Sequence, residues 1–135
     1  MLSRRYVAAC ALCAAGGLLA APVGTRAQAP GFTRTVLNRT EFPGDKMVTL
    51  QVLVEIEPNV LVARHTHPGI EDGYIVEGGG TFGMAGAVDR QVGPGDAFSV
   101  PVEVPHLLQN GPKRTRVLSI YVVEKDKPLA SPSPA

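Results

Sequence analysis

The stretch that decides the fold is Arg64 to Gly78, R-H-T-H-P-G-I-E-D-G-Y-I-V-E-G. His65 and His67 are two residues apart and follow a strand-like run, so both imidazoles are expected on one face of a strand. A Pro-Gly turn then brings Glu71 back beside them. Two neutral imidazoles and a carboxylate are ligands that divalent transition metals prefer. The stretch therefore predicts a metal site.

A fourth ligand is expected from His106, because the chain has three histidines and this one remains. It lies in residues 95–110, G-D-A-F-S-V-P-V-E-V-P-H-L-L-Q-N. A single His-x-His pair is more often ordinary surface or core sequence than a metal site. The glutamate and the second stretch with its own histidine favour the metal interpretation.

Together the two stretches resemble the motifs of the cupin superfamily. The first motif of that family has two histidines, a glutamate and a glycine at the spacing of His65, His67, Glu71 and Gly78. The second motif is matched by the set Gly95, Pro101, His106 and Asn110. The resemblance covers about residues 34–124 and implies a single β-barrel of the jelly-roll, double-stranded β-helix type. It also implies one divalent metal held by His65, His67, Glu71 and His106.

The chain departs from the two motifs at two turn positions. Asn59 and Glu103 stand where the family has glycine. Asparagine tolerates a positive φ better than most residues, so Asn59 is the milder change. Neither departure affects a ligand position.

The remaining pattern predicts an all-β domain without help from the family. Short strand-like runs are separated by Gly, Pro, Asn and Asp, and no stretch has a sustained 3.6-residue period. The longest run, residues 47–56, alternates Val48, Leu50, Val52, Val54 and Ile56 with more polar residues. Such spacing is typical of a β-sandwich or barrel.

Both ends of the chain lie outside this pattern. Residues 1–27 have a basic start, an uncharged apolar run and small residues near a cleavage position, as in a secretory signal peptide cut after Ala27 or Ala29. Export to the periplasm or outside the cell is expected by the general secretory route, or by the twin-arginine route through the Arg4-Arg5 pair. Residues 125–135 are rich in Pro, Ser and Ala, which predicts a disordered tail.

Composition limits the partners of the mature chain. Both cysteines, Cys10 and Cys13, lie in the predicted signal peptide, so no disulfide is expected afterwards. Ten basic residues then face twelve acidic ones, without a basic run, which argues against nucleic acid. No membrane span remains after cleavage. The resemblance to cupins adds a homodimer partner.

The predicted cavity is mainly apolar and suits a small molecule. Candidate lining residues from the strand pattern are Gln51, Leu61, Ala63, Phe98, Val100, Leu108 and Tyr121. The residue types accept iron, manganese, nickel, cobalt, copper or zinc. The chain is similar to the quercetin- and acireductone-dioxygenase-like cupins, and this resemblance favours a dioxygenase-like enzyme for a small enolic, phenolic or other oxygen-rich substrate, with Glu71 as catalytic base. The alternatives are a non-catalytic metal- or ligand-binding module and a metal-dependent isomerase or decarboxylase.

Overall fold

The computed structural model describes residues 30–44 and 46–134. In this part of the chain the regular elements are all β-strands, and no helix is present that is long and apolar enough to cross a membrane. The predicted signal peptide and its cleavage positions after Ala27 and Ala29 lie outside the described residues.

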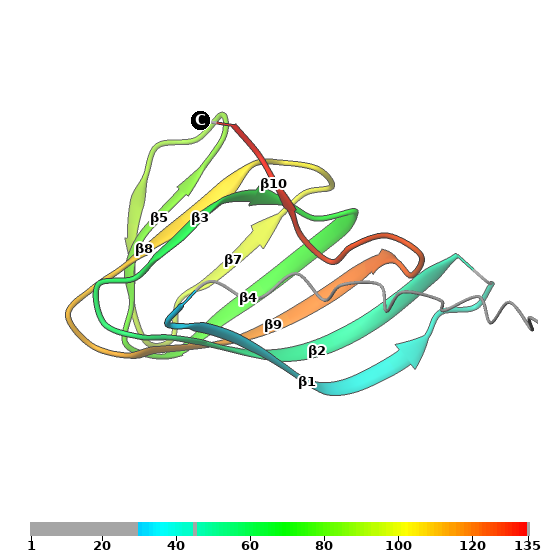
Figure 1. Cartoon of the computed structure of the whole chain (residues 1–135), viewed down its shortest axis with the longest axis horizontal. Helices are drawn as coiled ribbons and strands as arrows, with labels where there is room; N and C mark the ends of the chain where they lie inside the picture. Colours follow the sequence, from blue (N-terminus) through cyan, green and yellow to red (C-terminus); the bar gives the residue numbers. More distant parts are fainter. Residues whose placement is uncertain (1–29, 45, 135) are drawn as a thin grey trace, which may run out of the picture.

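Ten strands in the described ranges form two antiparallel five-stranded sheets that face each other (Figure 1). The first sheet contains, in spatial order, β1 (Phe32–Glu41), β2 (Met47–Ile56), β9 (Thr115–Glu124), β4 (Gly69–Glu77) and β7 (Ala97–Val100). The second contains β10 (Ser131–Pro132), β3 (Leu61–Thr66), β8 (His106–Asn110), β5 (Gly80–Met84) and β6 (Arg90–Val92). The result is a jelly-roll β-sandwich, which confirms the predicted all-β class.

Alternation along β2 and β9 builds the core between the sheets. Both strands bury every second side chain, and they pair along their full length, from Met47 with Glu124 to Ile56 with Thr115. The inward side chains of β2 are all apolar, whereas those of β9 include Ser119 and Tyr121. The apolar face therefore stabilises the sandwich, while β9 carries the hydroxyl groups of Thr115, Ser119 and Tyr121 into it.

Asn110 joins the two sheets at one end of the sandwich. Its buried amide nitrogen donates to the backbone carbonyls of Ile56, Glu57 and Lys113, and its oxygen accepts from the Thr115 hydroxyl. Buried carbonyls at strand ends need such partners. The final asparagine of the second motif is therefore structural in this chain and lies away from the histidines.

The two residues at the family's glycine positions adopt the conformation that glycine would. Asn59 has φ of 62° and Glu103 has φ of 58°, and they are the non-glycine residues with positive φ in the described chain. The left-handed region costs an ordinary residue about 1–2 kcal/mol. The chain thus keeps the turn geometry at both positions, and the loop before His106 closes with the Glu103 amide donating to the His67 carbonyl.

The structure differs from the predicted disordered tail. β10 pairs with the edge of β3, where Ser131 lies opposite Thr66 and Pro132 opposite His65. Leu129 is partly buried against the core. Composition alone misses this arrangement, because one apolar residue and two paired positions are enough to dock a short Pro-rich segment on an open sheet edge.

Candidate metal centre

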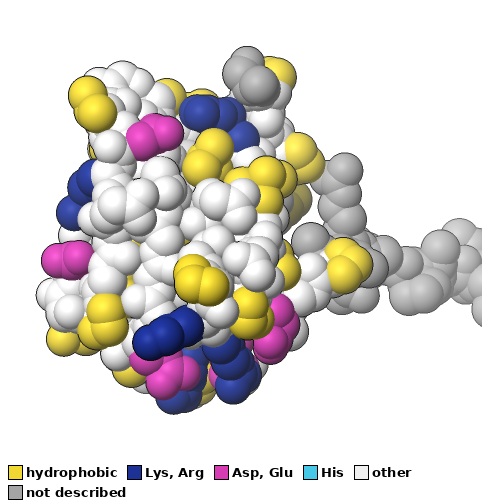
Figure 2. Space-filling model, turned by 90° about the vertical axis from the view of Figure 1, so that its left-hand side faces the viewer, with side chains coloured by type: hydrophobic (Ala, Val, Ile, Leu, Met, Phe, Trp, Pro, Cys, Tyr) yellow, Lys and Arg dark blue, Asp and Glu magenta, His cyan; other side chains and the backbone are white. Residues whose placement is uncertain are grey.

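Three histidines from two strands and one turn come together inside the sandwich. His65 is near the end of β3, His106 begins β8, and the two lie opposite each other in the sheet. His67 follows in the turn between β3 and β4. One ring nitrogen from each of the three lies within 4.8 Å of the others. His67 and His106 are 1% and 3% exposed, and no histidine side chain is visible on the face in Figure 2.

Backbone carbonyls determine which ring nitrogen of each histidine carries the proton. The Nδ1 atoms of His65, His67 and His106 lie 2.8, 2.5 and 3.0 Å from the carbonyl oxygens of Ala63, Leu129 and Val104. A carbonyl oxygen only accepts, so each Nδ1 must donate. In the neutral rings the Nε2 atoms then carry lone pairs. Such second contacts orient histidines that ligate a metal.

The Nε2 atoms of His67 and His106 converge on the carboxylate of Glu71. They lie 3.1 and 3.2 Å from Glu71 Oε2, yet neither forms a hydrogen bond with acceptable geometry, and both are buried. Lone pairs this close repel unless a positive group lies among them. Two ligands at right angles on a metal with bonds of about 2.1 Å are about 3.0 Å apart. The donor set therefore fits a divalent transition metal.

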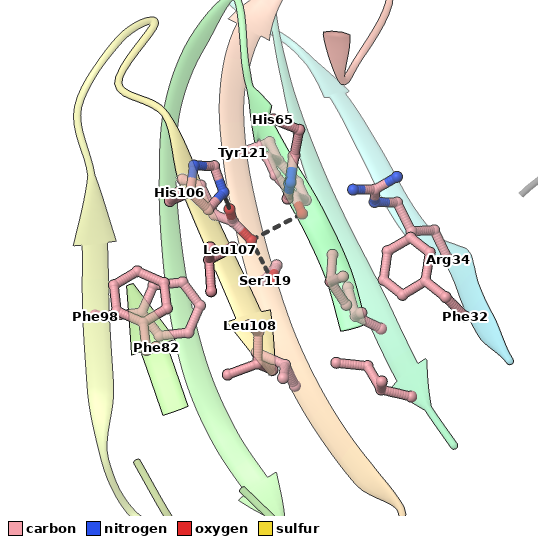
Figure 3. A pocket seen from close by; sticks show the side chains of 15 residues that line it. Phe32, Arg34, His65, Phe82, Phe98, His106, Leu107, Leu108, Ser119 and Tyr121 are labelled. Carbon is pink, nitrogen blue, oxygen red and sulfur yellow. Dashed lines mark hydrogen bonds and ion pairs between the residues drawn. The ribbon is translucent and has the colours of Figure 1, made fainter. Parts of the chain in front are cut away.

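Hydroxyl groups from β9 hold the other oxygen of Glu71. Ser119 Oγ and Tyr121 Oη each donate to Glu71 Oε1 over 2.8 Å (Figure 3). Burial by itself would raise the pKa of Glu71. Positive charge on the His106 and His67 rings, which the metal-free protein has only when these rings are protonated, and the hydrogen bond from Ser119 outweigh burial and hold this pKa below its usual range. The carboxylate is thus kept ionised, with Oε2 directed to the histidines.

His65 is also prepared to act as a neutral ligand. Burial, together with the neighbouring His106, lowers the pKa of His65 from 6.5 to about 4. Its imidazole is therefore uncharged at neutral pH, as metal coordination requires.

A small cavity of about 40 Å³ adjoins this cluster (Figure 3). This volume has room for a few water-sized groups. The apolar lining residues are Phe32, Val54, Ile56, Val62, Phe82, Phe98, Leu107, Leu108 and Val117. The polar lining residues are Arg34, His65, Glu71, His106, Ser119 and Tyr121. The site is thus an apolar chamber with its polar groups gathered near the histidines.

One wall of the chamber depends on a glycine. The rings of Phe82 and Phe98 stack with centroids 4.6 Å apart. Gly73 on β4 lies opposite Phe98 on β7, and a Cβ there would stand 2.1 Å from Phe98 Cζ. Only glycine leaves the ring room to lie across β4, so Gly73 sets the position of this wall.

Several sequence-predicted lining residues lie elsewhere. Phe98, Leu108 and Tyr121 are in the cavity wall, and Val100 is buried in the core behind it. Leu61 and Ala63 are exposed, because a register irregularity between Val62 and His65 shifts the alternation of β3 by one position. Val62 therefore faces the cavity with His65. Gln51 is exposed because β2 turns its valine face inward.

Sequence reasoning missed Phe32 and Arg34 on β1. Both line the cavity, and the arginine Cζ lies 4.5 Å from the centre of the Phe32 ring. Their i, i+2 spacing at the start of an edge strand was the available signal. A charged residue on an edge strand ordinarily faces solvent, so the pattern alone favours the wrong side.

A family model described as "Cupin domain" matches residues 52–121. No curated protein matches the sequence. Among solved structures, the chain resembles the DMSP lyase DddQ from Ruegeria pomeroyi DSS-3, with 23% identity, a TM-score of 0.65, and coverage of 82% of this chain and 57% of that one. The polyketide cyclase RemF from Streptomyces resistomycificus is also similar, with 24% identity, a TM-score of 0.60, and coverage of 78% of this chain and 73% of that one.

A third similar structure is KdgF from Halomonas sp., with 23% identity, a TM-score of 0.59 and coverage of 73% of this chain and 85% of that one. The chain spans about half the length of the DMSP lyase chains that it matches. At these identities the likeness concerns the fold.

Proposed function

Because the chain belongs to the cupin domain family, we propose that it is an exported, metal-dependent enzyme for a small oxygen-rich substrate, dioxygenase-like in its chemistry. One observation carries this proposal. Ring nitrogens of His65, His67 and His106 lie within 4.8 Å of one another beside an apolar chamber, and a carboxylate oxygen of Glu71 lies beside two of them, His67 and His106. Export is supported by the signal-like pattern of residues 1–27.

In this proposal His65, His67, His106 and Glu71 hold one divalent metal. When bound, such an ion supplies Lewis acidity, a template for a chelating substrate and, for a redox metal, access to dioxygen. The backbone carbonyls of Ala63, Leu129 and Val104 keep the three imidazoles oriented.

Glu71 is better suited to ligation than to proton transfer. With two hydroxyl donors on Oε1 and a lowered pKa, it is a weak base at neutral pH. A role as catalytic base would require these donors to turn away. Tyr121 has the opposite property, since burial and the nearby Glu71 raise its pKa and keep its hydroxyl protonated. It orients the carboxylate and retains its proton during turnover.

The chamber around these groups selects for size. Its walls are mainly aromatic and aliphatic side chains, and its volume is about 40 Å³. Apolar walls exclude water from the reacting groups and strengthen electrostatic contacts inside. Small enolic or hydroxylated compounds of a few heavy atoms, offering two adjacent oxygens, fit these conditions.

The second candidate is a non-catalytic binding module. It is favoured by the low proton affinity of Glu71 and the high proton affinity of Tyr121, which leave the lining residues without a ready acid or base. An isomerase or decarboxylase would use the same ligands, and it differs from a dioxygenase in consuming no oxygen.

Elemental analysis tests the proposal first. The protein is purified from its native compartment without added metal and compared with the His106→Ala variant. We expect one equivalent of a transition metal in the wild type and a large loss in the variant. No metal, together with no thermal shift upon adding iron, manganese, nickel, cobalt, copper or zinc, would refute the metal centre.

Oxygen uptake then separates the candidate functions. The metal-loaded protein is mixed with glycolate as a representative small compound with two adjacent oxygens, with the His106→Ala variant as control. Uptake that depends on His106 supports the dioxygenase. Glycolate binding without turnover supports the binding module.

A further inference from the structure

Arg34 places a positive charge in the wall of the chamber. Of the cavity-lining residues it is the only lysine or arginine, and it lies on β1, the edge strand of the first sheet. Figure 3 shows its guanidinium on the β1 side of the chamber, extended toward His65. The lining side chains beside it on β1 and β2 are the apolar Phe32, Val54 and Ile56. Placing a charge among apolar side chains costs free energy unless the charge is paired.

Packing on β1 and β2 orients this side chain. Arg34 pairs with Val54 and Phe32 with Ile56, so all four residues face the same chamber. The Phe32 ring lies under the guanidinium at 4.5 Å and is itself 7% exposed. A cation over a buried ring loses conformational freedom before any ligand arrives. The arginine is therefore preorganised on a rigid support.

The charge balance of the loaded chamber is positive. Arg34 contributes one positive charge to the lining, and the Glu71 carboxylate contributes one negative charge. A divalent metal at the proposed centre adds two positive charges, which leaves an excess that nearby apolar walls screen poorly. An anionic ligand would offset this excess, and a neutral phenol would not.

We propose that Arg34 is a specificity-determining residue that binds a carboxylate of the substrate, while another substrate oxygen faces the histidines. This inference rests on the proposed function, because the histidine centre must hold a metal. It narrows the substrate class to small carboxylates with a second oxygen nearby. The planar guanidinium fork matches a carboxylate by two parallel hydrogen bonds, and the volume of the chamber limits the ligand to a few heavy atoms.

The test compares an anion with its neutral analogue. Glycolate and glycolamide are titrated by calorimetry into Zn²⁺-loaded wild type, Arg34→Gln, Arg34→Lys and the control Arg39→Gln. Arg39 lies on the same strand but is exposed and paired with Glu41. The measured quantity is the ratio of the two affinities, which removes any general effect of a variant on the chamber. Zinc content and thermal unfolding are recorded for each protein.

We expect Arg34→Gln to reduce the glycolate preference about tenfold, the change that corresponds to about 1.4 kcal/mol. Arg34→Lys should recover part of the preference, because it keeps the charge but lacks the fork. Arg39→Gln should match the wild type.

A preference for glycolate that is unchanged in zinc-loaded, folded Arg34→Gln would assign it to the metal and overturn the anchor alone. Equal affinities of the wild type for glycolate and glycolamide would also overturn the proposed role of Arg34, because no preference for the anion would exist. If the wild type takes up no zinc or other metal, the proposed function itself fails, and the anchor fails with it.

Discussion

Replacing Tyr121 by Phe should weaken the fold by removing one hydroxyl from the buried Glu71 carboxylate. Tyr121 is 1% exposed, and its hydroxyl donates to Glu71 Oε1 over 2.8 Å. Burial and the nearby Glu71 raise the pKa of this tyrosine well above its usual value, so it donates at every pH of interest. The substitution keeps the ring and deletes only the donor.

The size of the effect follows from the charge on the acceptor. A hydrogen bond to an ionised group contributes about 1.5–3 kcal/mol, and Ser119 continues to donate to the same oxygen. We therefore expect a loss of about 2 kcal/mol in the metal-free protein. With a urea dependence of about 1.5 kcal/mol per M, the unfolding midpoint falls by about 1.3 M.

Urea unfolding in the presence of a chelator measures this shift, and Tyr74→Phe is the matched control because Tyr74 is 48% exposed on the outer face of β4. Glu71→Gln provides the second arm, since the Tyr121 effect should shrink when the carboxylate is replaced by an amide. If Tyr121→Phe and Tyr74→Phe shift the midpoint equally, the hydroxyls of β9 do not hold an ionised Glu71 and our account of the centre is wrong.

Three further predictions concern the centre and its loops. The folded-state pKa of His65, about 4, lies below its unfolded value near 6.5, so the metal-free protein should lose up to about 3 kcal/mol as pH falls from 6.5 toward 4. The lowered pKa of Glu71 adds a further loss only below about pH 4.5, and a flat stability profile in chelator between pH 6.5 and 4 would contradict the His65 prediction. His65→Ala should retain the far-ultraviolet spectrum of the strands but lose stoichiometric metal, and full metal retention by elemental analysis would remove His65 from the ligand set. Glu103→Gly should be about 1 kcal/mol more stable than Glu103→Ala in thermal unfolding, because both lack the carboxylate but only alanine is strained at φ of 58°; equal stability would mean that the loop relaxes.

The proximity of His65, His67 and Glu71 was predictable because its signal is local. His65 and His67 are two residues apart, and a short turn returns Glu71 beside them, so neighbouring positions contain most of the geometry. Alternation in residues 47–56 likewise predicted the inward face of β2, as found. In each case the spacing of residues along a strand determines directly which side of the strand their side chains face.

The cavity wall was less predictable because it depends on partners distant in sequence. An irregularity of register in β3 turns the side chains of Leu61 and Ala63 away from the cavity. It arises from pairing with β8, which lies more than forty residues later in the sequence. Arg34 faces inward because the Phe32 ring and the β2 surface accept it, which a count of charges on a strand does not reveal. Docking of β10 depends on the open edge of β3 and on Leu129, neither of which composition describes.

The contact between Leu129 and His67 makes β10 a reporter on the histidine cluster. Docking of the segment that ends in β10 and occupancy of the cluster both involve the His67 imidazole, and any coupling between the two equilibria is equal in both directions. Hydrogen exchange of the Ser131 and Ser133 amides should then slow when an ion is bound, and clipping the segment should speed ion release. Binding of an ion that has no spectroscopic signal of its own could thus be followed through the exchange rates of the Ser131 and Ser133 amide protons.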